Sequence, residues 1–235
     1  MKRMLSTLLL CGAVWGSCAA AAAAQTVVDK DQNAVLRRLS AESGGRLEVR
    51  WHAETGTPSL LLGKLSPPSA HSPAWIAGEF VTKTRRLYGI RNPHSHLKIV
   101  HVEKLPEESA YRVHLQHYLY KTPVWGDELR IEIGGNGVVE RVEGRIYPDL
   151  AKAISNRPRR ATVSQAEAIR IAAAAAAGAA GPGAGDAPLD TAQALPYYLP
   201  SRTGIPLVYA VTLYPPDQPP VSVMVHALTG RTIAH

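Results

Sequence analysis

Apolar and polar residues alternate through the middle of the chain, which indicates strands, because successive side chains of a strand point to opposite faces. The alternating segments are residues 97–101, 111–119, 129–133 and 138–146. In the first segment we expect Leu97, Ile99 and His101 on one side. The turn at residues 134–137 is rich in glycine, which tolerates positive φ and favours a hairpin. The pattern predicts an antiparallel sheet with one packed face.

A helix is predicted before these strands. Ser72 followed by Pro73 is typical of an N-cap and a first helical position, and the helix is expected to end near Gly89. Its apolar face consists of Ile76, Phe80 and Leu87. Phe80, the only phenylalanine of the chain, is therefore expected in the core.

A second helix is predicted after residue 163. Ser164 and Glu167 have the spacing of a capping box, and the helix continues into an alanine run before a glycine-rich loop at residues 181–185. Strands are expected at residues 207–214, 221–226 and 231–234. Upstream, residues 34–39 suggest a short helix, and residues 47–51 and 59–62 suggest strands.

These elements predict an α+β fold of two small domains, each a helix packed on an antiparallel sheet. The expected divisions are a signal peptide at residues 1–24, an N-terminal strand and loop segment at 25–72, a first domain at 73–150, a basic linker at 151–162 and a second domain at 163–235. The linker is also the expected site of proteolytic nicking.

The N-terminus has the zones of a secretory signal: Lys2 and Arg3, an apolar stretch at 4–15, and small residues at 19–24. We expect cleavage after Ala24, so the mature chain would be secreted or periplasmic. A lipoprotein acylated at Cys18 is the alternative. No later stretch approaches the roughly 20 apolar residues that a membrane span needs, so no membrane insertion of the mature chain is expected.

Cysteine usage and charge exclude several functions. Cys11 and Cys18 both lie inside the predicted signal, which leaves the mature chain without disulfides or thiolate chemistry. Without Lys2 and Arg3 the chain has 24 basic and 19 acidic residues, a formal charge of +5. Export and the absence of an arginine-rich stripe argue against nucleic acid as a partner.

The sequence offers no catalytic or metal-binding constellation. H-E-x-x-H does not occur, so a thermolysin-type zinc site cannot be built from these residues. His114 and His117 are expected on opposite faces of a strand, and His94 and His96 in a loop. Carboxylates near the sheet, such as Glu103, are expected on a solvated face. We therefore expect no enzyme activity, no metal and no cofactor.

Residues 120–133, with Lys-Thr-Pro-Val-Trp-Gly leading into the glycine-turned hairpin, resemble the fungalysin/thermolysin-type propeptide (FTP) domain. The final Ala-Leu-Thr-Gly-Arg-Thr-Ile, residues 227–233, resembles a PepSY-type domain. The PepSY family usually has an acidic residue where this chain has His226. The resemblance covers about residues 73–235, the two parts that precede the catalytic domain in secreted thermolysin-like metallopeptidases.

The resemblance implies a stand-alone pro-region that binds a thermolysin-like zinc metallopeptidase non-covalently as inhibitor, folding chaperone or both. It implies that a free tail enters the peptidase cleft, and that tail is Thr232, Ile233, Ala234 and His235. Trp125 is either a partner contact or a core residue packed against the Phe80 helix. The alternatives are a remnant of a disrupted peptidase gene, and an envelope peptide-binding module with no peptidase partner.

Overall fold

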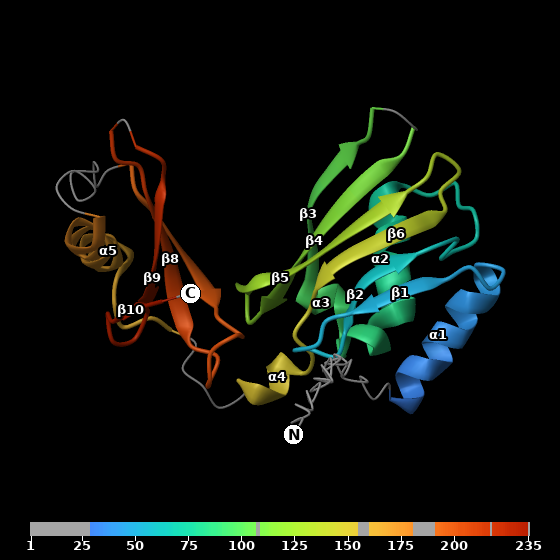
Figure 1. Cartoon of the computed structure of the whole chain (residues 1–235), viewed down its shortest axis with the longest axis horizontal. Coiled ribbons are helices and arrows are strands. Elements are labelled where there is room, and N and C mark those ends of the chain that lie inside the picture. Colours follow the sequence, from blue (N-terminus) through green and yellow to red (C-terminus); the bar gives the residue numbers. More distant parts are fainter. Residues whose placement is uncertain (1–28, 107–108, 155–159, 181–190, 217, 235) are drawn as a thin grey trace, which may run out of the picture.

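The structure is a computed structural model that describes residues 29–106, 109–154, 160–180, 191–216 and 218–234. The predicted signal peptide, with Cys11, Cys18 and the cleavage point after Ala24, lies outside the described residues. So do residues 155–159 of the predicted linker, the predicted glycine-rich loop at 181–185, and His235. The described residues form two lobes side by side (Figure 1).

The first lobe contains an antiparallel sheet of six strands in the order β1-β2-β6-β5-β4-β3, with its hairpin turn at residues 134–137 as predicted. We call it the first sheet. Its strands are β1 (Glu48–Trp51), β2 (Pro58–Leu62), β3 (Leu97–Lys104), β4 (Tyr111–Leu119), β5 (Thr122–Ile133) and β6 (Val139–Arg145).

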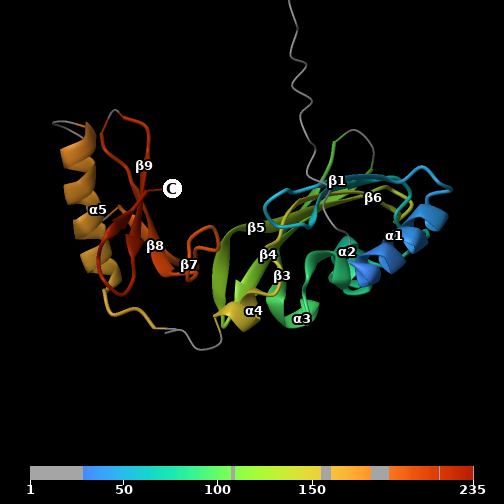
Figure 2. The ribbon, with the colours of Figure 1, turned by 60° about the horizontal axis from the view of Figure 1, so that its bottom comes forward.

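Helices cover one face of the first sheet (Figure 2). Ser72 caps α2, since its Oγ accepts the Trp75 N–H at 3.4 Å, and the helical segment ends at Gly89 with φ +63°. Phe80 is buried in the core, as predicted. The helices of this lobe are α1 (Lys30–Glu42), α2 (Pro73–Thr84), the 3-10 turn η1 (Arg85–Tyr88) and α3 (Pro93–His96).

The second lobe packs one long helix on one face of a four-stranded antiparallel sheet in the order β7-β8-β9-β10, which we call the second sheet. Ala168, Ala172 and Ala176 are buried in the helix, and their small side chains let it lie close to the strands. The elements are α5 (Gln165–Ala180), β7 (Gln193–Tyr198), β8 (Leu207–Leu213), β9 (Val221–His226) and β10 (Thr232–Ile233). The fold class is therefore α+β, as predicted.

One parallel pairing joins the two sheets, Val124 of β5 with Tyr198 of β7. Val124 and Leu119 are buried with the second core although they follow the first sheet in sequence. The short helix α4 (Leu150–Ala153) lies at the base between the lobes, and its Leu150 belongs to the same second core (Figure 1).

Three expectations are corrected. His101 does not share a side with Leu97 and Ile99, because the β3–β4 register shifts between Ile99 and His101 and turns His101 to the opposite face, beside His114. His94 and His96 lie in the single helical turn α3 rather than in a loop, since Pro93 sits at its first position. β7 was not expected, because Pro196 and two tyrosines interrupt its alternation.

Candidate functional site

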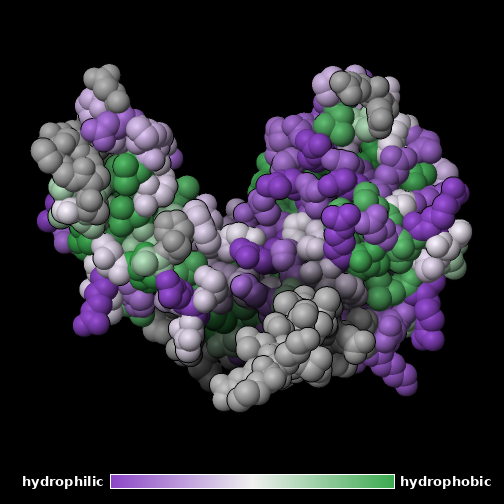
Figure 3. Space-filling view, viewed as in Figure 1, coloured by the Kyte–Doolittle hydropathy of each residue, from purple (hydrophilic) through white to green (hydrophobic). Residues whose placement is uncertain are grey.

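A deep notch separates the two lobes in the space-filling view (Figure 3). The second lobe turns the helix-free face of the second sheet toward this notch (Figures 1 and 3). Leu195 is 51% exposed on this side, next to the partly buried Tyr197 and Ile233 and the buried Met224. A preformed apolar face without a covering helix is a feature of protein-binding surfaces.

Trp125 follows Val124 in β5, whose pairing with Tyr198 of β7 joins the two sheets. Its ring meets Tyr197 edge to face, with the centroids 5.0 Å apart, an arrangement that favours aromatic pairs. Trp125 does not pack against Phe80, because the two belong to different apolar clusters. The cause is local: Gly126 has φ +71° and the β4–β5 register shifts nearby, so the alternation set by Leu129 does not continue to Trp125.

The predicted tail is part of the second sheet. Thr232 and Ile233 form β10, which pairs with Val225 and Met224 of β9. The Ala234 carbonyl accepts a hydrogen bond from the Arg202 guanidinium. His235 lies outside the described residues. The tail is therefore held as an edge strand whose Ile233 joins the apolar face of the notch.

His226, the departure from the PepSY pattern, organises the turn before the tail. Its Nδ1 accepts the backbone N–H groups of Leu228 at 3.2 Å and Thr229 at 3.3 Å. An acidic side chain at this position could accept the same N–H groups. The imidazole accepts both N–H groups through an Nδ1 that carries no proton.

The open face of the first sheet is a network of charge pairs. Arg112 of β4 bridges Glu103 of β3 and Glu132 of β5, with N–O distances of 2.8 Å to each. The hydrogen bond from Arg112 lowers the pKa of Glu103. Arg130 pairs with Glu128 on the same face. These carboxylates are neutralised by neighbouring cations, which fits a solvated face.

A buried pair lies where β4 and β5 approach the second lobe. His117 Nδ1 donates to Asp127 Oδ2 at 2.9 Å, and the Tyr147 backbone N–H donates to the same oxygen at 2.9 Å. Burial raises the pKa of Asp127. Asp127 Oδ1 and Arg145 Nε have no partner among the described residues. Because Asp127 is fully buried, the pair connects strands rather than facing the notch.

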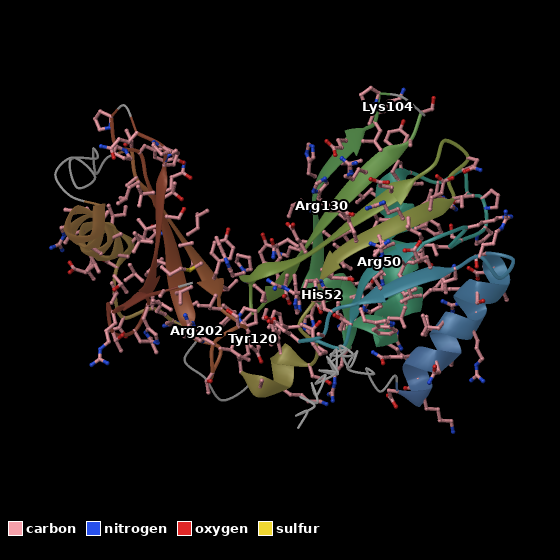
Figure 4. The ribbon with its side chains drawn as sticks, viewed as in Figure 1. Arg50, His52, Lys104, Tyr120, Arg130 and Arg202 are labelled. Atoms are coloured by element: carbon pink, nitrogen blue, oxygen red, sulfur yellow. The ribbon has the colours of Figure 1, made fainter. Side chains whose placement is uncertain are left out.

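The turn between β4 and β5 is strained. Tyr120 and Lys121 have φ of +49° and +70°, values that the primed two-residue hairpin turns require and that non-glycine residues adopt at a cost. Figure 4 places Tyr120 and Arg202 near the base of the notch, Arg130 on the open face, and Lys104 at the far end of β3.

The other predicted histidines are separated. His114 lies on the open face, 3.4 Å from Glu103, whereas His117 is buried, so the two point to opposite faces of β4 as predicted. No group of three or more histidine, cysteine or acidic side chains is arranged to bind a metal in the described part of the chain. No described helix is both long and apolar enough to cross a membrane.

Comparisons with known proteins add little. No protein-family model matches the chain. Among solved structures, the chain is similar to the C-terminal domain of Bacillus megaterium YpeB, at 11% sequence identity and a TM-score of 0.39. The match covers 87% of this chain and 95% of that one. We draw nothing about function from a likeness at this score.

Sequence reasoning placed Trp125 near the site but missed its neighbours. Tyr197 and Leu195 lie on β7, which was not expected as a strand. Gln193, Leu195 and Tyr197 are spaced two residues apart, which places all three on one face of a strand. This spacing was the signal in the sequence that could have predicted the site.

Proposed function

We propose that the protein is an exported, non-catalytic pro-region-like protein that binds a thermolysin-like zinc metallopeptidase as inhibitor, folding chaperone or both. In this proposal the signal peptide is cleaved after Ala24 and the protein acts in the periplasm or outside the cell. The peptidase is a separate protein, and binding is non-covalent.

The observation that carries the proposal is the uncovered apolar face at the notch. Leu195 is half exposed there, while Tyr197 and Trp125 support each other. A rigid aromatic pair beside an exposed aliphatic side chain is suited to anchor a protein partner, since little side-chain freedom is lost on binding. The resemblance of residues 120–133 and 227–233 to peptidase pro-regions supports a peptidase as that partner.

In this proposal the tail binds the peptidase as part of the second sheet and not as a free peptide. For Thr232 to enter a peptidase cleft, β10 would have to leave β9, and the Arg202 bond to Ala234 would have to break. We therefore assign Ile233 a contact from within the sheet, next to Met224.

The test is a titration of a thermolysin-like peptidase from the same cell with the purified protein. We expect saturable loss of activity near one-to-one stoichiometry. Digestion of the added protein without loss of activity would refute the inhibitor and favour a gene remnant or a peptide-binding module.

Point variants locate the contact. Leu195→Glu should weaken inhibition tenfold or more, equivalent to about 1.4 kcal/mol, because it places a charge in the contact. Ala174→Glu is the matched control, since it adds the same charge at an exposed position of α5, on the covered side of the sheet. Deletion of Thr232 to His235 should also weaken inhibition tenfold. Equal inhibition by the wild type, Leu195→Glu, Ala174→Glu and the deletion variant would exclude the helix-free face of the second sheet as the contact surface.

A further inference from the structure

β3 is an edge strand of the first sheet. It pairs with β4 on one side, and no described strand pairs with its other side. The outer edge of such a strand presents backbone N–H and C=O groups that can pair with another chain. β3 lies on the side of the first lobe that is nearer the second lobe (Figure 1).

This edge is unusually apolar. Ile99, Val100 and Val102 are 39%, 57% and 40% exposed. Ile99 is opposite Leu115 and Val102 is opposite Val113, so both lie on the side of the sheet that α2 covers. The charged residues of β3 lie toward its two ends, whereas three aliphatic side chains cluster within four positions at its centre, next to the register shift between Ile99 and His101.

A groove of about 150 Å³ continues this apolar edge toward α2. A Cβ added to Gly78 would meet no atom within 4 Å, so the groove is open above the helix at that point. A strand added beside β3 would point alternate side chains toward this groove. The lining residues are Gly78, Val81, Pro93, His94, Leu97, Ile99 and Leu115.

The charges along the edge are uneven. Glu103 is already engaged by Arg112, whereas Lys98 and Lys104 have no ion-pair partner among the described residues. Lys98 lies over the Tyr118 ring at 4.5 Å. Within β3 itself, the charges without an ion-pair partner among the described residues are therefore positive. They favour an acidic partner over a second copy of this chain, which would bring the same lysines.

We propose that β3 is a docking edge for an extended segment of another protein, with acidic residues at its ends and alternating aliphatic residues between them. The segment adds a strand to the first sheet, places one aliphatic side chain in the groove at Gly78, and pairs its acidic ends with Lys98 and Lys104. This site uses other residues than the contact proposed at Trp125 and Leu195, and it does not depend on a peptidase partner.

The probe is an eight-residue capped peptide with glutamate at both ends and alternating valine and threonine between them. Eight residues match the length of β3, at roughly 3.3 Å per residue. We expect saturable binding by calorimetry, with the amide NMR shifts of residues 98–104 moving most.

One pair of variants and one double variant test the contacts. Gly78→Leu fills the groove and should weaken binding at least tenfold, whereas Gly78→Ala should change it less than twofold. Combined Lys98→Glu and Lys104→Glu should weaken binding of this probe at least tenfold and should improve binding of a probe with lysine at both ends. Thermal unfolding of each variant establishes that it is folded.

Three outcomes would overturn the proposal. The first is the absence of saturable binding. The second is binding that Gly78→Leu and the charge reversal leave unchanged, or that moves amides outside β3. The third is a concentration-dependent dimer that shifts the same amides without the probe, since the edge would then pair with itself.

Discussion

Substitution of Asp127 separates the cost of burying its charge from the value of its hydrogen bonds. Asp127 Oδ2 accepts from His117 Nδ1 and from the Tyr147 backbone N–H, both at 2.9 Å, and the side chain is fully buried. Asp127→Ala removes this acceptor and leaves two buried donors unpaired. Each unpaired donor costs about 1–3 kcal/mol, so we expect a loss of about 2–6 kcal/mol in the free energy of unfolding.

Asp127→Asn keeps an oxygen that can accept both bonds but carries no charge at any pH. Burial raises the pKa of Asp127 above its unfolded value. The contribution of such a group to stability is fully present below the unfolded pKa, about 3.9, and is lost as the pH rises through the folded pKa. The wild-type protein should therefore lose stability relative to Asp127→Asn as the pH rises above the unfolded pKa of about 3.9.

The assay is urea unfolding of the wild type, Asp127→Asn and Asp127→Ala at pH 4, 5.5 and 7, followed by tryptophan fluorescence. Titrating groups that do not contact Asp127 are shared by the three proteins, so their contributions largely cancel in the differences. We expect the free energy of unfolding of Asp127→Asn to be within about 1 kcal/mol of the wild-type value at pH 4. It should then increase relative to the wild-type value as the pH rises toward 7. A difference that grows in favour of wild type with rising pH would refute the reasoning, because the ionised pair would then stabilise the fold.

Thermal and urea unfolding of five other variants tests the turn conformation, the turn acceptor and the close strand packing. Lys121→Gly should stabilise by about 1 kcal/mol, because glycine adopts the positive φ of this turn without strain; no gain would mean that the turn is not strained. His226→Ala should lower the free energy of unfolding by about 1 kcal/mol, whereas His226→Asp should keep the wild-type value. Equal losses in the two variants would exclude a role of the His226 side chain as a hydrogen-bond acceptor. Gly144→Ala should cost about 3 kcal/mol, because its Cβ would lie 2.0 Å from the Glu128 carbonyl oxygen, whereas Gly78→Ala should be tolerated; equal stability of the two would contradict the close β5–β6 approach.

The parts of the fold that follow a simple period were predictable from the sequence. Alternation predicted β4 and β9, and the Ser72 cap predicted the start of α2, because these signals depend only on neighbouring residues. Ser164 likewise accepts the Glu167 N–H at 3.2 Å at the start of α5.

The departures come from non-local geometry. The β3–β4 bulge reverses His101, and the positive φ of Gly126 turns Trp125 away from the Phe80 core, although nothing in the period marks either change. β7 was missed because Pro196 and two tyrosines interrupt its alternation, and because its pairing with β5 joins residues that lie far apart in sequence. The site could be only partly predicted for the same reason, since Trp125 meets Tyr197 through that pairing.

The single pairing of Val124 with Tyr198 has a practical consequence for dissecting the protein. Leu119, Val124, Leu150 and Ile154 all precede residues 155–162 yet are buried among the side chains of the second core. A cut within that segment would leave the C-terminal fragment with vacant positions in its interior, and would expose the same four side chains on the N-terminal fragment. Either half expressed alone is therefore expected to aggregate, because it exposes apolar side chains that are buried in the intact protein. Co-expression of the two fragments in one cell would be the better way to study them.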